Sequence, residues 1–342
     1  MHLFPGLSID LDAAVTEGVQ LPVCDKQEIS LSVLRLDKIH PVMSGNKWFK
    51  LLYHLEAARQ QRAEGLLSFG GAYSNHIVAV ACAAADAGLA SVGVIRGEAP
   101  AQLSPTLQDA QGYGMQLVFM ERSVYKTATD PEGGMMVQAI AAQYPGYYLI
   151  PEGGSGPRGV RGSAEILPLI NAAAYSHLLC AMGTGTMFAG LAEGVGRQES
   201  GVGRQESGVG RQESGVRSQE SGVGRQEAGV GSQGLGGEIE RQVIGIPVLK
   251  GEAAWAVPPA GRIIEGYHFG GYARRTPALL EFMNFFYDNT GIPTDFVYTG
   301  KLLFATLDLI GKGYFARGSR VVAVHSGGLQ GNRSLKEGTL HF

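Results

Sequence analysis

Short apolar runs alternate with longer amphipathic stretches along most of the chain. The runs have the two-residue period of strands, whereas the stretches between them place apolar residues three and four apart, as helices do. Gly65 and Gly88 stand where two such helices are expected to end. Strands are predicted at 29–36, 66–69, 91–95, 116–119, 177–181, 243–246 and 321–324, and helices at 46–62, from 75 towards 88, and at 106–112.

This alternation is typical of βαβ units, in which a helix connects two parallel strands. We therefore expect an α/β fold with two open, twisted and mainly parallel sheets, each flanked by helices. In such sheets, ligand-binding residues lie in the loops at the carboxyl ends of the strands. Segments that directly follow predicted strands are therefore the places where functional side chains are expected.

A seven-residue repeat interrupts the pattern. The unit GVGRQES begins at Gly194, recurs twice at the same spacing, and returns with changes from Gly215 and Gly222. Each unit has one valine and usually two glycines, so it lacks the paired apolar positions of a coiled coil. Each glycine also costs about 1 kcal/mol in a helix relative to alanine. We expect residues 194–234 to be a flexible, disordered insertion, with a partner-binding role as the alternative.

Composition and charge exclude several classes of function. The chain has 342 residues, 51 of them glycine, with 44% hydrophobic residues and a formal net charge of −3. This balance provides no basic surface for nucleic acid or for anionic lipid. The three cysteines are far apart and odd in number, which fits a reducing compartment. With no leader-like start and no apolar run of about 18 residues, we expect a cytoplasmic protein without membrane contact.

A glycine-rich loop follows the fifth predicted strand. Gly183, Thr184, Gly185 and Thr186 precede an apolar helical run, so backbone N–H groups and the helix dipole would favour a bound phosphate. A plain tight turn explains the same residues. The loop lacks the lysine of a P-loop, and Phe188 stands at the third glycine position of a dinucleotide fingerprint. Nucleotide binding is therefore disfavoured.

Two lysines lie at the start of the helix predicted from residue 46. Lys47 and Lys50, in the segment SGNKWFK, share one face near the helix N-terminus, where the dipole disfavours positive charge. A buried or crowded lysine there has a lowered pKa, as an amine that forms a Schiff base requires. Two solvated surface lysines are the alternative interpretation.

Three further segments offer hydroxyl, amide and imidazole groups. Ser74, Asn75 and His76 precede a helix whose free N–H groups favour a bound carboxylate. His76 is either a proton-transfer group or an ordinary side chain at a helix start. Ser326 lies in the segment HSGGL, which follows the last predicted strand. Tyr298 is a candidate for catalysis, although a single tyrosine is more often a packing residue.

Together and in this order, these segments resemble the pyridoxal-phosphate enzymes of fold type II, the tryptophan synthase β-like group. Within that group the chain is similar to the 1-aminocyclopropane-1-carboxylate deaminase and D-cysteine desulfhydrase family. The resemblance extends from about residue 30 to residue 331, apart from the repeat. It rests on GNKWFK from Gly45, SNH from Ser74, the glycine loop from Gly183 and HSGG from His325.

The resemblance implies pyridoxal 5'-phosphate as the cofactor and a role for each motif. Lys47 would form the internal aldimine, and Lys50 would approach the phosphate held by the glycine loop. Asn75 is expected beside the phenolic oxygen of the cofactor, and Ser326 at its pyridine nitrogen. Substrate contacts are expected from Ser74, Asn75, His76 and Tyr267, with Tyr298 as a second proton-transfer group.

The resemblance also implies how the chain is organised. Residues 1–47 and 152–342 would form a large cofactor-binding domain, into which the repeat is inserted, and residues 48–151 a small domain. The family further implies a homodimer that acts on a small amino acid.

Two positions bear on the choice of substrate. In the family, ring-opening deaminases typically carry Tyr-Glu in the segment V-Y-x-G-K and S-N-Q in the substrate loop, whereas this chain has Thr299 and His76 there. Opening an unactivated ring places heavy demands on positioned acid–base groups. We therefore expect β-elimination from D-cysteine, giving pyruvate, ammonia and hydrogen sulfide, with 1-aminocyclopropane-1-carboxylate deamination as the alternative.

Functions of another class also stay open. A catalytically silent pyridoxal-phosphate-binding protein would be yellow and would release no product from any amino acid. An interaction protein would bind its partner through the repeat, and binding would disappear when residues 194–234 are deleted.

Overall fold

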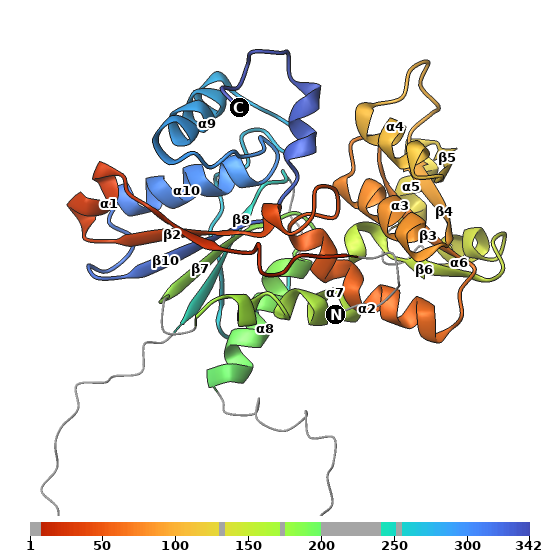
Figure 1. Cartoon of the computed structure of the whole chain (residues 1–342), viewed down its shortest axis with the longest axis horizontal. Helices are drawn as coiled ribbons and strands as arrows, with labels where there is room; N and C mark the ends of the chain where they lie inside the picture. Colours follow the sequence, from red (N-terminus) through yellow and green to blue (C-terminus); the bar gives the residue numbers. More distant parts are fainter. Residues whose placement is uncertain (1–7, 130–133, 172–174, 200–240, 251–254) are drawn as a thin grey trace, which may run out of the picture.

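The computed structural model describes residues 8–129, 134–171, 175–199, 241–250 and 255–342. These residues form two sheets in adjacent lobes, with helices on both faces of each sheet (Figure 1). The fold is therefore α/β with two mainly parallel sheets, as the pattern predicts. The boundaries of the two expected domains stay a prediction.

The larger sheet has six strands in the spatial order β1-β2-β10-β7-β8-β9. The first pair is antiparallel and all the other neighbours are parallel, so their carboxyl ends meet at one edge. The strands are β1 (Thr16–Val19), β2 (Ser30–Arg35), β7 (His177–Met182), β8 (Gln242–Pro247), β9 (Gly261–Ile263) and β10 (Arg320–His325).

The smaller sheet has four strands in the order β5-β4-β3-β6, and all neighbours are parallel. Its strands lie between residues 65 and 150, so they come from one continuous part of the chain. They are β3 (Gly65–Gly71), β4 (Ala90–Arg96), β5 (Gln116–Met120) and β6 (Tyr147–Ile150).

Helices cover both sheets, and α2 and α7 pack against each other between the two lobes (Figure 1). The α-helices are α1 (Pro22–Gln27), α2 (Asn46–Gln60), α3 (Asn75–Ala87), α4 (Pro105–Gly112), α5 (Arg122–Thr129), α6 (Gly134–Ala141), α7 (Pro157–Ala164), α8 (Thr186–Glu199), α9 (Pro277–Thr290) and α10 (Thr299–Gly311). Short 3-10 helices are η1 (Leu36–Lys38), η2 (Glu152–Gly154), η3 (Leu167–Leu169) and η6 (Leu329–Ser334).

The core of the larger sheet follows the two-residue period of its strands. In β10, Val321 and Ala323 belong to the apolar cluster that includes α10, whereas Val322 and Val324 belong to the cluster that includes α8. Both faces are buried, which is why the strand is apolar at every position from 321 to 324. The rigid sheet therefore presents the loops after its strands in fixed positions.

Helix α3 shows why a functional helix begins where it does. The hydroxyl of Ser74 accepts a hydrogen bond from Ile77 N at 3.4 Å, and Gly88 ends the helix in a left-handed conformation with φ of 68°. The predicted start and end are therefore confirmed. Ser74 and Asn75 are thereby held at the helix N-terminus.

Residues 194–199, the described part of the first repeat unit, are helical, and the expectation of a flexible segment from residue 194 is wrong there. Helix α8 continues to Glu199 because Val195 is fully buried and Gly194 packs on Leu167. A Cβ at Gly194 would lie 2.5 Å from Leu167 Cδ1, so the glycine permits a close approach that offsets its low helix propensity. The rest of the predicted insertion, residues 200–234, lies outside the described residues.

No helix in the described part of the chain is both long enough and apolar enough to cross a membrane.

Candidate functional site

A cavity of about 230 Å³ lies at the carboxyl ends of strands from both sheets. Loops after β7 and β10 reach it from the larger sheet, and loops after β3, β4 and β6 reach it from the smaller sheet. This is the position at which open parallel sheets bind ligands. Its walls include Asn46, Lys47, Lys50, Gly71, Ser74, Asn75, His76, Arg96, Glu152, Gly153, Ala181, Gly183, Thr184, Gly185, Met187, Leu249, Tyr272, Tyr298 and Ser326.

The structure brings nearly all the predicted site residues together in this cavity. Thr186 lies just behind the wall, where its hydroxyl is 2.9 Å from the Thr184 hydroxyl. Tyr267 lies elsewhere: its hydroxyl donates to Asp308 Oδ2 at 2.6 Å. The wall position is taken by Tyr272, so the placement of Tyr267 at the substrate is not supported by the structure.

A buried lysine fixes the conformation of the loop that carries these two tyrosines. Lys301, fully buried on α10, donates from Nζ to the backbone oxygens of His268 at 2.9 Å and Gly271 at 2.8 Å. Burial lowers the pKa of Lys301 to about 8, although Asp295 acts to raise it. These bonds fix the loop so that Tyr272 faces the cavity.

Lys47 and Lys50 lie at the first turn of α2. Lys47 Nζ donates to Asn46 Oδ1 at 2.7 Å and lies 5.7 Å from the centre of the Tyr298 ring. Burial lowers the pKa of Lys47 to about 8, with Asp295 opposing the shift. Burial and then the charge of Lys47 lower the pKa of Lys50 to about 7. An unprotonated amine is therefore accessible near neutral pH at both positions.

The glycine loop opens α8 opposite these lysines. Lys50 Nζ donates to Thr184 Oγ1 at 3.4 Å, and Gly185 has φ of 78°, which glycine adopts without strain. Two lysine amines, threonine hydroxyls and a helix N-terminus converge here. Each of these groups attracts negative charge, so the arrangement fits a phosphate.

Asn75 and His76 face this loop from α3. The oxygen Asn75 Oδ1 is buried and has no hydrogen-bond partner among the described residues. The hydroxyl of Ser68 donates to Ile150 O at 2.9 Å, so it accepts from His76 Nε2 at 2.8 Å. Burial and then the charge of Lys50 hold the pKa of His76 well below its usual range. His76 is therefore a neutral imidazole.

Tyr298 is held by the cap of α10. Asp295 accepts hydrogen bonds from the backbone N–H groups of Val297, Tyr298 and Thr299 at 2.8–2.9 Å, and from the Thr299 hydroxyl at 2.7 Å. Burial, and then the neighbouring Tyr272, raise the pKa of Tyr298 well above its usual range. Tyr298 is therefore a neutral phenol on a fixed backbone, and its ring lies beside Lys47.

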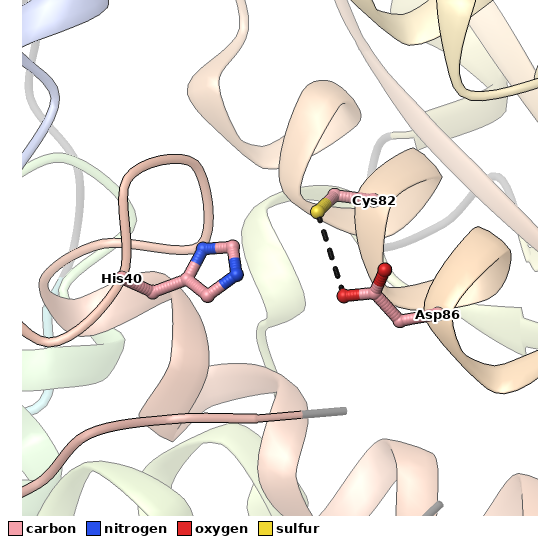
Figure 2. Close-up of side chains that lie close together, drawn as sticks. All are labelled: His40, Cys82 and Asp86. Atoms are coloured by element: carbon pink, nitrogen blue, oxygen red, sulfur yellow. Dashed lines mark hydrogen bonds between the residues drawn. The ribbon is translucent and has the colours of Figure 1, made fainter. Parts of the chain in front are cut away.

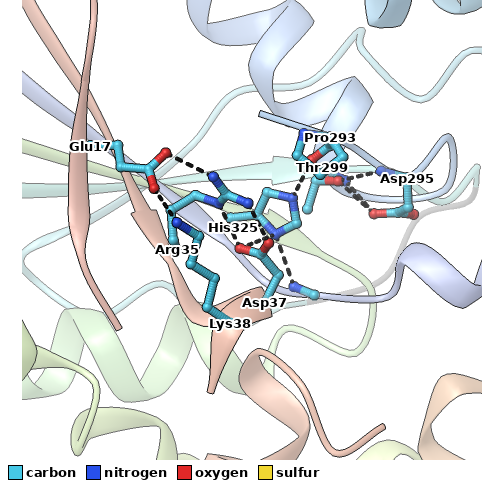
Figure 3. Close-up of polar contacts among 9 residues, drawn as sticks. Glu17, Arg35, Asp37, Lys38, Pro293, Asp295, Thr299 and His325 are labelled. Atoms are coloured by element: carbon cyan, nitrogen blue, oxygen red, sulfur yellow. Dashed lines mark hydrogen bonds and ion pairs between the residues drawn. The ribbon is translucent and has the colours of Figure 1, made fainter. Parts of the chain in front are cut away.

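A chain of charged groups leads from Glu17 through Arg35 and Asp37 to His325, the residue before Ser326 (Figure 3). Arg35 donates to both carboxylate oxygens of Asp37 at 2.7–2.9 Å and to Glu17 Oε2 at 2.7 Å. Asp37 Oδ1 lies 3.3 Å from His325 Nδ1, and His325 Nε2 lies 2.8 Å from Pro293 O. Burial acts to raise the pKa of Asp37, but the Arg35 hydrogen bonds and the His325 charge lower it overall.

A second group of polar side chains, His40, Cys82 and Asp86, lies between the loop before α2 and helix α3 (Figure 2). His40 Nδ1 accepts from the backbone N–H groups of Val42 and Met43 at 2.9–3.0 Å, so its ring proton is on Nε2 in the neutral form. A metal-bound histidine has the reverse arrangement, with its free nitrogen donating. Burial, and then Asp86, raise the pKa of Cys82 to about 12. The group fits a structural contact and does not fit a metal site.

Three polar residues of the cavity wall carry no motif that points to them in the sequence. Arg96, Glu152 and Tyr272 line the wall, but none belongs to the segments quoted for the family resemblance. Arg96 is the last residue of β4, and Glu152 is separated from β6 by Pro151 alone. Their position after strands is the signal that points to them, once β6 is recognised as a strand.

Comparisons with known proteins agree with this geometry. Residues 15–327 match the family described as pyridoxal-phosphate dependent enzyme. One relative is a Pyrococcus furiosus protein provisionally named as a 1-aminocyclopropane-1-carboxylate deaminase. The two sequences are 26% identical, and the alignment covers 88% of this chain and 85% of the relative. Another relative is a D-cysteine desulfhydrase from Salmonella typhi. It is 24% identical to this chain, and the alignment covers 86% of each sequence. These relatives confirm the resemblance that the motifs predict.

Solved structures support the same fold. A structure described as an ACC deaminase homologue matches with a TM-score of 0.70 and 20% identity, covering 93% of this chain and 90% of its own. An O-ureido-L-serine synthase matches with a TM-score of 0.62 and 14% identity, covering 96% of each chain. At this identity the likeness establishes the fold alone.

The cavity itself fits pyridoxal phosphate. The lysines and hydroxyls around the glycine loop suit its phosphate, and the buried, unpartnered amide oxygen of Asn75 marks a wall that is built for a polar ligand. Lys47 offers the amine that this cofactor requires. The match to the family model extends over most of the chain and includes every one of these residues. The chain therefore belongs to the family of pyridoxal-phosphate dependent enzymes.

Proposed function

We propose that this enzyme catalyses β-elimination from a small amino acid, with D-cysteine as the favoured substrate and pyruvate, ammonia and hydrogen sulfide as products. Pyridoxal phosphate, when bound, supplies the delocalisation of the electron pair that is left on the α carbon. The observation that carries the proposal is the position of Lys47, an amine in the cavity wall whose pKa is lowered to about 8 and which lies 5.7 Å from the centre of the Tyr298 ring.

Each remaining side chain has a positional role in this proposal. Lys50 and the loop 183–186 hold the phosphate, Ser326 lies at the pyridine nitrogen, and Asn75 at the phenolic oxygen. Ser74 and the N-terminus of α3 receive the substrate carboxylate, because the free N–H groups there favour an anion. Lys47 accepts the α proton, for which an amine with a pKa of about 8 is suited.

The residue after Tyr298 favours elimination over ring opening. Thr299 is fully buried and its hydroxyl donates to Asp295 inside the α10 cap, so it is absent from the described cavity wall. Ring-opening members typically carry a carboxylate at the position of Thr299. In this chain a residue of the α10 cap replaces it. The relative from Pyrococcus furiosus keeps 1-aminocyclopropane-1-carboxylate as the second candidate substrate.

The test is product release by purified, cofactor-loaded protein. D-cysteine and 1-aminocyclopropane-1-carboxylate are supplied separately, and pyruvate, sulfide and 2-oxobutanoate are measured. Pyruvate and sulfide from D-cysteine, abolished in Lys47→Ala, support the proposal. Release of 2-oxobutanoate alone would replace it with ring opening. A yellow protein that is inert with both compounds and with other small D- and L-amino acids would indicate a catalytically silent binding protein.

A further inference from the structure

Among the described residues, Glu152 is the one carboxylate that lines the cavity, and the proposed roles of the other side chains leave it without a function. It begins η2, which follows β6 at the carboxyl edge of the smaller sheet. The two glycines after it hold the backbone close to the cofactor-binding residues. A Cβ at Gly153 would lie 3.0 Å from Thr184 Cγ2, and one at Gly154 would lie 3.1 Å from Lys50 Cβ.

Burial and neighbouring groups act on the pKa of Glu152 in opposite directions, and the net shift is upward. It is partly buried, and burial raises its pKa although the Tyr125 hydroxyl and the Arg96 charge oppose the shift. When it is ionised, Glu152 acts to raise the pKa of Tyr272 and Tyr298 in the same cavity, so its carboxyl group lies near both hydroxyls. Lys47, Lys50 and His76 line the same cavity, have lowered pKa values and are its bases. The cavity thus contains bases of lowered pKa and one carboxyl group of raised pKa, the combination from which base and acid roles are assigned.

We propose that Glu152 is a catalytic acid that protonates the leaving group in the β-elimination, an inference that rests on the proposed function. The bond between Cβ and its heteroatom breaks, the electron pair leaves with the heteroatom, and the Glu152 proton is transferred to it. The electron pair of the Cα–H bond becomes the new Cα–Cβ bond, and Lys47 takes that proton. Water then hydrolyses the enamine to pyruvate and ammonia, and proton exchange with solvent restores Glu152.

This role defines a class of substrate. A hydroxyl or an amino group on Cβ is a poor leaving group unless it receives a proton. Protonation accelerates the departure of a thiol less, and a halide leaves without receiving a proton. Glu152 therefore extends the proposed activity from D-cysteine to small amino acids that carry a hydroxyl or an amino group on Cβ, with D-serine as the simplest probe.

The experiment compares leaving groups in one enzyme. Pyruvate release is measured from D-serine, D-cysteine and β-chloro-D-alanine for the wild type, Glu152→Gln, Glu152→Asp and the control Glu165→Gln. Glu165 is exposed at the end of α7, where it accepts from the Tyr53 hydroxyl at 2.6 Å, outside the described cavity wall. Glu152→Gln is expected to lower kcat for D-serine about 100-fold more than kcat for β-chloro-D-alanine.

In the same experiment D-cysteine should fall between these two substrates, and Glu152→Asp should recover part of the loss because it keeps an acid. The dissociation constant for pyridoxal phosphate, measured by fluorescence titration, is expected to differ less than about threefold between Glu152→Gln and the control. This second readout separates a loss of proton donation from a loss of cofactor.

Two results would overturn the inference and leave the proposed function standing: an equal loss of kcat on all three substrates, or a loss explained by weaker cofactor binding. Either would assign Glu152 a structural role. If the wild type releases no pyruvate from any of the three compounds, the proposed function fails and the inference fails with it.

Discussion

The amines of Lys47 and Lys50 lie three residues apart in one buried corner, hydrogen-bonded to Asn46 and Thr184. Taking an ammonium group out of water is unfavourable. Two lysines buried together are therefore expected where one of them binds an anion or one of them acts as a neutral amine. The proposed function needs both: an anion site at Lys50 and a neutral amine at Lys47. The lowered pKa of each lysine is the electrostatic consequence.

This arrangement predicts that the cofactor-free protein becomes more stable as pH rises from 7 to 9. The pKa of Lys50 is about 7 in the folded chain and near 10.5 when unfolded, so over this range the unfolded chain binds a proton that the folded chain does not. Stability therefore increases with pH, by on the order of 2 kcal/mol from Lys50. Lys50→Met should flatten the pH dependence of the free energy of unfolding, measured with urea at both pH values. Identical slopes in the two proteins would contradict the lowered pKa.

Sequence motifs locate most of the cavity wall but miss the residues that lie outside motifs. Lys47, Ser74 and Ser326 are found because they stand in segments that follow strands or open helices. Glu152 is missed because β6 has four residues and no expected strand precedes it. Tyr272 is missed because the direction of its loop depends on hydrogen bonds from α10, which lies in a later part of the chain.

At the level of elements, the start of α2 depends on a close contact between two loops. Gly45 has φ of 66°, and a Cβ there would lie 1.9 Å from the backbone oxygen of Ser326. The backbone N–H of Asn46 donates to the same oxygen at 3.3 Å. The lysine segment and the serine segment are therefore positioned by each other, and a side chain at residue 45 would separate them.

Gly45→Ala is accordingly expected to weaken pyridoxal-phosphate binding by at least about tenfold, because a backbone contact cannot be relieved by a rotamer change. Gly88→Ala is the matched control. Gly88 has a similar φ of 68° but nothing lies within 4 Å of its Cβ position, so it should cost about 1 kcal/mol of stability and leave affinity intact. Cofactor titration and urea unfolding of both variants distinguish the effects. Equal affinities in the two variants would show that the loop contact is not required.

The network Glu17–Arg35–Asp37–His325 links elements that are far apart in the chain, because it joins η1 to β1, β2 and β10 of the larger sheet (Figure 3). Asp37→Asn should destabilise the protein by about 3 kcal/mol, since it leaves the buried Arg35 with one carboxylate, Glu17, in place of two. Asp288→Asn removes an exposed partner of His341 and should cost less than about 1 kcal/mol. Urea unfolding measures both, and similar losses would argue against a structural role for the buried network.

The repeat shows where local propensity and tertiary packing disagree. Glycine content alone predicts a flexible segment from residue 194. The helix α8 nevertheless continues to Glu199, because Val195 is buried. Such long-range contacts are invisible in the local pattern, although the pattern correctly predicts the strands β7 and β8 on either side. The boundary of any dispensable insertion therefore lies after α8, not at the first repeat unit.

Two deletions test this boundary in the intact enzyme. Removing residues 201–234 keeps α8 and leaves eight residues, 200 and 235–241, between α8 and β8, close to the usual length of about two to six residues for such a connection. This variant should retain the fold and bind pyridoxal phosphate. Removing residues 194–234 also removes the buried Val195 and the contact of Gly194 with Leu167, and should cost a further 2 kcal/mol or so. Urea unfolding and cofactor titration of both variants give the answer, and equal stability of the two would show that the first repeat unit does not support the sheet.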